Sequence, residues 1–197
     1  MFRDRRRRRA RAEAVVRARQ LLLADDDQAT LEFLEDAAER FPEDPEIRVL
    51  LAATLLEIRP DEVASQAAKA AEFGVDDPVI QVRAGHLLLG RGEVAAARAC
   101  ASRASELAGP DFVLLSGLEA LEGQIAALDG EDVRAEQLLR SAVERDPEYA
   151  GYAVDLARFL ANRDRVEESL AVIDKSLGLA KRKNELERMR TDIAGEA

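Results

Sequence analysis

The sequence is poor in the residues on which most enzymes and metal sites depend. Its 197 residues include one cysteine, Cys100, and one histidine, His86. A single cysteine excludes an intrachain disulfide, which fits a reducing compartment. No pair of His or Cys stands at metal-ligand spacing, and neither a glycine-rich phosphate loop nor a serine elbow occurs. We therefore expect no metal, no cofactor and no enzyme activity.

Aromatic residues and long apolar runs are also scarce. Aromatics make up 4% of the chain, and tryptophan is absent. No stretch approaches the ~20 apolar residues of a membrane span. The positive N-terminus is not followed by the apolar core of a signal peptide, because Glu13, Arg17 and Arg19 interrupt it. We expect a cytoplasmic protein without strands, since no alternation of apolar and polar residues is bounded by turn signals.

The residues that could carry chemistry have simpler interpretations. His86 and Cys100 would form a nucleophile pair only if they met. They stand fourteen residues apart on different predicted helices, and we favour a buried thiol and a groove or surface imidazole. Carboxylate pairs such as Glu35/Asp36 and Glu167/Glu168 are typical of solvated helix faces.

Charge is distributed unevenly along the chain. Residues 1–11 carry seven Arg and one Asp, a net charge of +6, so the remainder carries −16 of the total of −10. Residues 1–9 offer little apolar anchorage, and we predict a disordered basic arm. One alternative function for such an arm is salt-dependent binding of nucleic acid or an anionic surface. The alternatives are the acidic body of its own or a neighbouring copy, and a solvated tail. Its cations are Arg3, Arg5, Arg6, Arg7, Arg8 and Arg9.

Strong helix formers dominate the composition, and apolar periodicity predicts amphipathic helices throughout. Asp44-Pro45 and Asp77-Pro78, 33 residues apart, each place an Asp N-cap before a Pro at the first helical position. Helices are expected at about 10–24, 28–41, 45–58, 60–73, in the two halves of 78–109, and at 111–128 and 184–194.

A repeat frame unites these helices. Units that start at residues 11, 45, 78, 116 and 150 have spacings of 34, 33, 38 and 34. Their eighth, twentieth and twenty-seventh residues are all small, which lets neighbouring helices approach closely. The eighth residues are Ala18, Ala52, Gly85, Gly123 and Ala157; the twentieth are Thr30, Ala64, Ala97, Ala135 and Ser169; the twenty-seventh are Ala37, Ala71, Ala104, Ala142 and Ser176.

This pattern resembles the tetratricopeptide repeat family, whose 34-residue unit is a pair of antiparallel helices with small residues at these positions. The resemblance covers about residues 11–194. It implies an all-α, right-handed superhelix (solenoid) of about five helix hairpins and a C-terminal capping helix. The implied single domain spans 10–197, with units near 11–44, 45–77, 78–110, 116–149 and 150–183 and a capping helix at 184–194. The 38-residue spacing puts five extra residues around Gly109, which lengthen the next helix.

The resemblance also implies that first helices line a concave groove for a peptide or a partner protein. We expect a non-catalytic interaction scaffold whose mostly apolar groove suits a peptide with apolar anchors. The alternatives are an unused shallow groove, binding of nucleic acid or an anionic surface through the arm, and self-assembly into a homo-oligomer. The groove positions correspond to Val15, Arg19, Val49, Ala53, Leu56, Val82, His86, Leu89, Gln124, Arg158 and Asn162.

Overall fold

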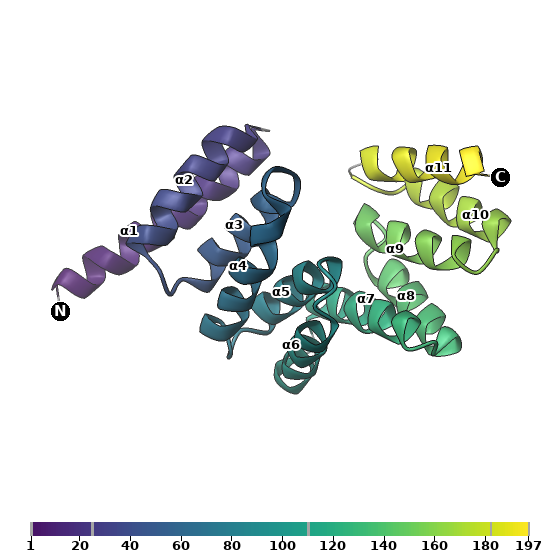
Figure 1. Ribbon diagram of the computed structural model, residues 1–197, viewed down its shortest axis with the longest axis horizontal. Helices are drawn as coiled ribbons and strands as arrows, with labels where there is room; N and C mark the ends of the chain where they lie inside the picture. Colours follow the sequence, from purple (N-terminus) through teal and green to yellow (C-terminus); the bar gives the residue numbers. More distant parts are fainter. Residues whose placement is uncertain (1, 25, 110, 182, 197) are drawn as a thin grey trace. The chain divides into compact units, whose positions relative to one another are not determined.

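The protein is built from helices joined by short turns (Figure 1). A computed structural model describes residues 2–24, 26–109, 111–181 and 183–196, and over these ranges it contains no strand. Contacts divide the chain into two compact units, Met1–Leu107 and Ala108–Ala197. We call them the N-terminal and the C-terminal unit and describe each by itself.

The N-terminal unit consists of three helix hairpins. Ile47, Leu55, Val63 and Ile80 are among its fully buried side chains, so one core runs through the hairpins. The helices are α1 (Phe2–Leu23), α2 (Asp27–Arg40), α3 (Pro45–Ile58), α4 (Pro60–Phe73), α5 (Pro78–Gly90) and α6 (Val94–Leu107).

The C-terminal unit consists of two hairpins and a last helix. Its helices are α7 (Phe112–Leu128), α8 (Asp132–Arg145), α9 (Ala150–Ala161), α10 (Val166–Leu177) and α11 (Asn184–Glu196). Leu186 and Ile193 of α11 are buried against α9 and α10, while most of its other described side chains are exposed. This is the polar-backed closing helix that the sequence predicts, and it covers the last apolar surface of the stack.

Two expectations about organisation have different outcomes. The sequence predicts a disordered arm over residues 1–9, whereas the structure places residues 2–9 in the first turns of α1. Arginine is a good helix former, and the Arg9 guanidinium forms an ion pair with Glu13 one turn later, so the helix extends through the basic stretch. The single continuous domain over 10–197 stays a prediction, because contacts divide the chain into two units at the long spacing.

Aspartate caps start α3 and α5 as the sequence predicts, and a further one starts α7. The Asp44 carboxylate accepts a hydrogen bond from the backbone N–H of Ile47 at 3.0 Å. Asp77 caps α5 in the same way, and Asp111 caps α7. Each carboxylate satisfies backbone donors that the first turn of a helix leaves without an intrahelical partner.

Three hairpins share one turn. Gly92, Gly130 and Asp164 have positive φ angles of 79°, 76° and 58°. They occupy the fifteenth position of their units, and the residue after each donates its N–H to the carbonyl of residue 11 of the unit. Such a left-handed residue reverses the chain between two antiparallel helices, and glycine adopts it at little cost.

The small residues of the frame lie where helices meet, except for the two in α4. Thirteen of the fifteen are buried, and a Cβ on Gly123 would lie 2.9 Å from Leu139 Cγ of the facing helix. In α4, however, Val63, Ala67 and Ala70 are fully buried, whereas Ala64 and Ala71 are only partly buried. Arg59 alone separates α3 from α4, and α4 begins at the sixteenth position of its unit, whereas the other second helices begin at the seventeenth, so the frame is displaced by one residue in α4. The missing residue accounts for the 33-residue spacing.

The long spacing has the predicted effect on α7. This helix has 17 residues, against 13 in α5 and 12 in α9. The additional turn precedes the repeat frame, in line with the extra residues that the sequence places around Gly109. Pro110 of this connection lies outside the described residues.

Candidate functional site

In each unit the first helices of neighbouring hairpins lie closer to one another than the second helices do. In the N-terminal unit α1 packs against α3 and α3 against α5, but α2 and α4 make at most marginal contact with each other. In the C-terminal unit α7 packs against α9 and α9 against α11, without a comparable contact between α8 and α10. Each stack is therefore curved, with the first helices on its inner side, which we call the inner face.

The N-terminal unit exposes part of the predicted groove set. Leu56 is 43% exposed, and Arg19 is exposed as well. The remaining accessible members are half-buried; they are Val15, Ala53, His86 and Leu89.

Two members of that set need correction. The side chain of Val49 is 1% exposed and that of Val82 is 6% exposed. Both first helices are covered on more than one side, so a residue at a nominal groove position can face the neighbouring helix instead. A ligand could not reach these two side chains in this packing, so they are not part of the accessible inner face.

An ion-pair cluster joins the three first helices of the N-terminal unit. The Glu46 carboxylate of α3 lies 2.8 Å from the guanidinium of Arg19 on α1 and 2.8 Å from that of Arg83 on α5. Partial burial opposes ionisation of Glu46, but the hydrogen bonds from Arg19 and Arg83 outweigh it and lower its pKa. Of these three residues, the sequence pattern predicted only Arg19 as part of the groove. The available signal for Glu46 was its place as the second residue of its unit.

In the C-terminal unit two predicted residues meet at a carboxylate that the sequence did not single out. Arg158 Nη1 lies 3.7 Å from Asp155 Oδ1, and the Gln124 side chain hydrogen-bonds the same carboxylate from α7. Burial raises the pKa of Asp155 to about 6, against the lowering effects of Arg158 and Gln124, and Glu185 adds to the rise. Asp155 is the one acidic residue of α9, which was a signal in the sequence.

The last predicted groove residue stands apart from this cluster. Asn162 is exposed at the C-terminal cap of α9. Its backbone N–H closes the helix by donating to the carbonyl of Arg158. Its side chain is thus accessible at the end of the inner helix.

In each of the two carboxylate pairs, at least one carboxylate is bound by an arginine. Glu35 pairs with Arg59, and Glu168 pairs with Arg165 at 2.7 Å. Arg165 and Arg140 also bind Glu136, and hydrogen bonding from Arg165 above all lowers the pKa of Glu136 to about 2. A carboxylate in this state is a poor general acid or base near neutral pH.

The thiol of Cys100 has the environment of a core residue. The side chain is buried, and burial raises its pKa above the ordinary value. A raised pKa lowers the thiolate fraction, which is the nucleophilic form. His86 is half-buried on the neighbouring helix α5. Nothing in this arrangement favours nucleophilic catalysis over packing.

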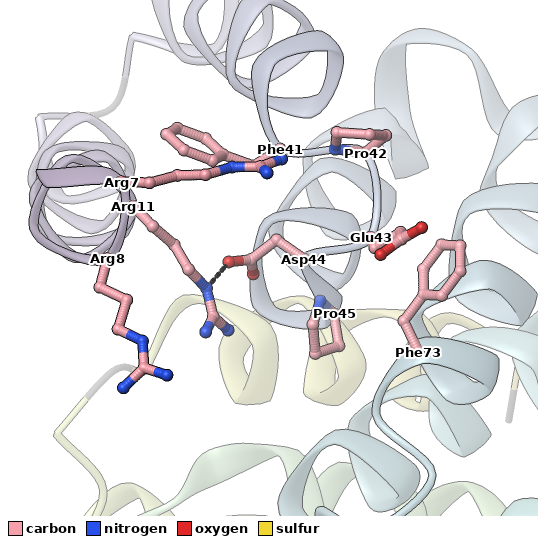
Figure 2. A pocket seen from close by; sticks show the side chains of 9 residues that line it. All are labelled: Arg7, Arg8, Arg11, Phe41, Pro42, Glu43, Asp44, Pro45 and Phe73. Carbon is pink, nitrogen blue, oxygen red and sulfur yellow. Dashed lines mark hydrogen bonds and ion pairs between the residues drawn. The ribbon is translucent and has the colours of Figure 1, made fainter. Parts of the chain in front are cut away.

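A pocket of about 630 Å³ lies at one edge of the N-terminal unit (Figure 2). Arginines of α1 form one wall, the α2–α3 turn forms another, and Phe73 at the end of α4 closes the far side. Arg11 pairs with Asp44 inside it. The lining residues are Arg7, Arg8, Arg11, Phe41, Pro42, Glu43, Asp44, Pro45 and Phe73.

The predicted basic arm contributes to this pocket. Arg5 to Arg9 are all exposed on α1. Arg7 and Arg8 reach the pocket, whereas Arg5 and Arg6 do not line it. The side chain of Arg3 lies outside the described part of the chain.

Metal and membrane sites were searched over the described residues only. Within them, no three or more His, Cys, Asp or Glu side chains gather in an arrangement that could hold a metal ion. Within the same residues, every helix is too short or too polar to cross a bilayer.

Comparisons with known proteins identify the fold. No protein-family model matches the sequence, and no curated protein matches it. A thermophilic tetratricopeptide repeat protein of Thermus thermophilus is 20% identical, with a TM-score of 0.72 over 93% of this chain and 98% of that one. The pilus biogenesis factor PilW is 18% identical, with a TM-score of 0.69 over 95% of this chain and 87% of its own.

A third similar structure is PilF of Pseudomonas aeruginosa. It is 14% identical, with a TM-score of 0.65 over 96% of this chain and 85% of its own. At these identities the similarity shows the fold. It confirms the all-α arrangement of helix hairpins that the repeat frame predicts.

Proposed function

We propose that this chain, which has the fold of tetratricopeptide repeat proteins, is a scaffold that binds a peptide or a segment of a partner protein on its inner face. The fold supports protein interaction in general terms. The groove itself and its ligand are our proposal. The observation that carries it is the mixed character of the accessible inner-face side chains in both units.

In the N-terminal unit these side chains suit a ligand with an apolar anchor beside polar groups. Leu56, Leu89 and His86 offer partly exposed apolar or aromatic surface. Arg19, Glu46 and Arg83 offer a charged cluster on neighbouring helices. Peptide grooves combine pockets for side chains with polar groups that fix orientation.

In the C-terminal unit Asp155 supplies a further recognition group. Its partners do not fully offset the cost of burying its charge, since its pKa stays raised to about 6. A cationic or N–H donor of a ligand would supply the missing stabilisation. We infer that the segment bound here presents such a donor to Asp155.

Site-specific photo-crosslinking in cells tests the inner face. A photo-reactive phenylalanine would replace Leu56 in one variant and Asn162 in another. Val133, which is exposed on the second helix α8, provides the matched control. We expect one partner to crosslink from the inner-face positions and not from Val133, as identified by mass spectrometry. Leu56→Asp should then weaken binding of the purified partner.

Two results would contradict the proposal. Crosslinking from all three positions alike would indicate non-specific contact. Intact affinity of Leu56→Asp and Asp155→Ala for the identified partner would show that the inner face is an unused shallow groove, which is the alternative left open by the sequence.

We also propose that the scaffold is non-catalytic and acts in the cytoplasm. The buried thiol of Cys100 and the arginine-bound carboxylates support the first part. Fractionation of cells that express the tagged chain tests the second: recovery with the membrane or extracellular fraction would be contrary to it.

A second candidate function is binding of nucleic acid or an anionic surface through the basic start of α1. The exposure of Arg5 to Arg9 favours it. Removal of residues 1–9 should then abolish retention on DNA or RNA at low salt, because each neutralised phosphate contributes to a salt-dependent affinity. Unchanged retention would exclude this role. Light scattering on the same samples tests the homo-oligomer.

A further inference from the structure

We propose that the pocket between α1, the α2–α3 turn and the end of α4 binds an acidic segment of a protein partner, with carboxylates on the arginines and an apolar side chain among the Phe and Pro residues. The pocket is distinct from the inner-face set, since no lining residue belongs to that set. Binding at this pocket can therefore be tested independently of binding on the inner face.

The cationic wall of the pocket is available to a ligand. Arg7 and Arg8 form no ion pair with a described side chain, and both are exposed. Guanidinium groups bind carboxylates through two parallel hydrogen bonds, which gives them directional as well as charge complementarity. Two such groups on one turn of α1 match neighbouring carboxylates on an acidic peptide.

The acidic residues in the lining do not cancel this wall. Asp44 is buried, accepts the N–H of Ile47 and pairs with Arg11, so its charge is already compensated within the protein. Glu43 is exposed, and Figure 2 shows it on the Phe73 side, away from Arg7 and Arg8. The arginine side of the pocket therefore remains positive.

The opposite side of the pocket is apolar and partly rigid. Phe73 on this side is 38% exposed, whereas Phe41, which Figure 2 shows beside Arg7, has most of its surface buried. Pro42 and Pro45 restrict the backbone of the turn between α2 and α3. A ligand side chain would cover the exposed edge of Phe73 without reordering the turn, so little conformational entropy opposes binding.

An acidic peptide fits this pocket better than a nucleic acid does. Beyond residue 11 the chain carries a net charge of −16, which repels a long polyanion. A phosphate backbone also has no group for the apolar side of the pocket. A short segment with two carboxylates and one apolar side chain uses both sides and presents little charge to the acidic body.

Fluorescence anisotropy with the full chain tests the pocket. The probe is a fluorescein-labelled hexapeptide of alternating aspartate and phenylalanine, and a second probe has alanine in place of phenylalanine. We expect a Kd below about 1 mM for the first probe. Arg7→Glu with Arg8→Glu should weaken it about tenfold or more, because two direct charge pairs become repulsive.

The matched control is Arg5→Glu with Arg6→Glu, which makes the same change of net charge on the same helix but outside the lining. It should weaken the probe less than about threefold, since only screened long-range interactions change. Phe73→Ala should weaken the phenylalanine probe about threefold and leave the alanine probe unaffected. Circular dichroism verifies that the variants keep their helix content.

Several outcomes would overturn the proposal. They are no binding below about 1 mM, an equal loss from both arginine pairs, and a Phe73→Ala variant that binds both probes as the parent does. Tighter binding of a fluorescein-labelled oligothymidine that displaces the peptide would assign the arginines to nucleic acid instead.

Discussion

Arg11 on α1 pairs with Asp44, the residue that caps the start of α3. The Asp44 side chain is 2% exposed, whereas that of Arg11 is half exposed. The same carboxylate accepts the N–H of Ile47 in the first turn of α3. A single buried carboxylate thus caps α3 and joins it to α1 of the preceding hairpin.

Replacement of Asp44 should separate these roles. Asp44→Ala removes both the cap and the ion pair, and we expect a loss of about 2 kcal/mol in the free energy of unfolding. Asp44→Asn keeps a capping oxygen and should cost about half as much. Urea unfolding followed by circular dichroism measures both. Equal stabilities of the two variants would mean that the cap contributes nothing.

The turn glycines give a second prediction. Gly92 has a positive φ of 79°, so Gly92→Ala should destabilise the protein by about 1 kcal/mol. Gly90, two residues earlier, ends α5 and a Cβ there would meet open space. Gly90→Ala should therefore be neutral or slightly stabilising. The two variants differ only in backbone conformation at the site, and thermal unfolding would show the contrast; equal melting temperatures would contradict it.

The displaced register of α4 predicts an asymmetric response to larger side chains. Ala67 is fully buried, so Ala67→Leu should cost about 2 kcal/mol through overpacking. Ala64 occupies the twentieth position of the frame but is only partly buried. Ala64→Leu should cost less than about 1 kcal/mol. Denaturant unfolding measures the stability of both variants. A larger loss for Ala64→Leu than for Ala67→Leu would show that the repeat frame is not displaced in α4.

Asp155 predicts a pH dependence in the acid-to-neutral range. Burial raises its pKa from the ordinary value of 3.8 to about 6 in the folded protein. The folded state therefore holds the proton more tightly than the unfolded state, so stability should fall as pH rises from about 4 to about 6 and stay lower above that. The loss is on the order of 3 kcal/mol.

Asp155→Asn isolates this contribution. The amide cannot ionise, so the variant should lack the decline and exceed the parent in stability at pH 8. Glu136, whose pKa is lowered to about 2, titrates at more acidic pH, and all other carboxylates are present in both proteins. Unfolding free energies of the two proteins at pH 4, 6 and 8 provide the measurement. Parallel curves would show that Asp155 ionises as an exposed carboxylate does.

Much of the fold was predictable because its signals are local. The bounds of α3 and α4 match those expected from capping and proline residues. Asp44 and Asp77 cap helices because their side chains reach donors only two or three residues away. The small residues were visible as a periodic pattern, since a close approach recurs at the same place in every hairpin.

The candidate sites were less predictable because they depend on how neighbouring hairpins pack. The frame assigned Val49 and Val82 to an open face, yet adjoining helices cover both. It missed Glu46 and Arg83, whose ion pairs join residues 27 or more apart, and Asp155, whose carboxylate Gln124 reaches from another helix. The sequence predicts a disordered basic stretch, although residues 2–9 belong to α1.

The sequence by itself determined the helices, their caps and their repetition, because these depend on hydrogen bonds and periodicity within a few residues. Tertiary structure decided which groove positions stay accessible, which residue of α4 enters the core, and where arginines meet carboxylates. Burial and charge pairing at those points depend on the distance between helices, and a one-residue change in a turn rotates a whole helix face.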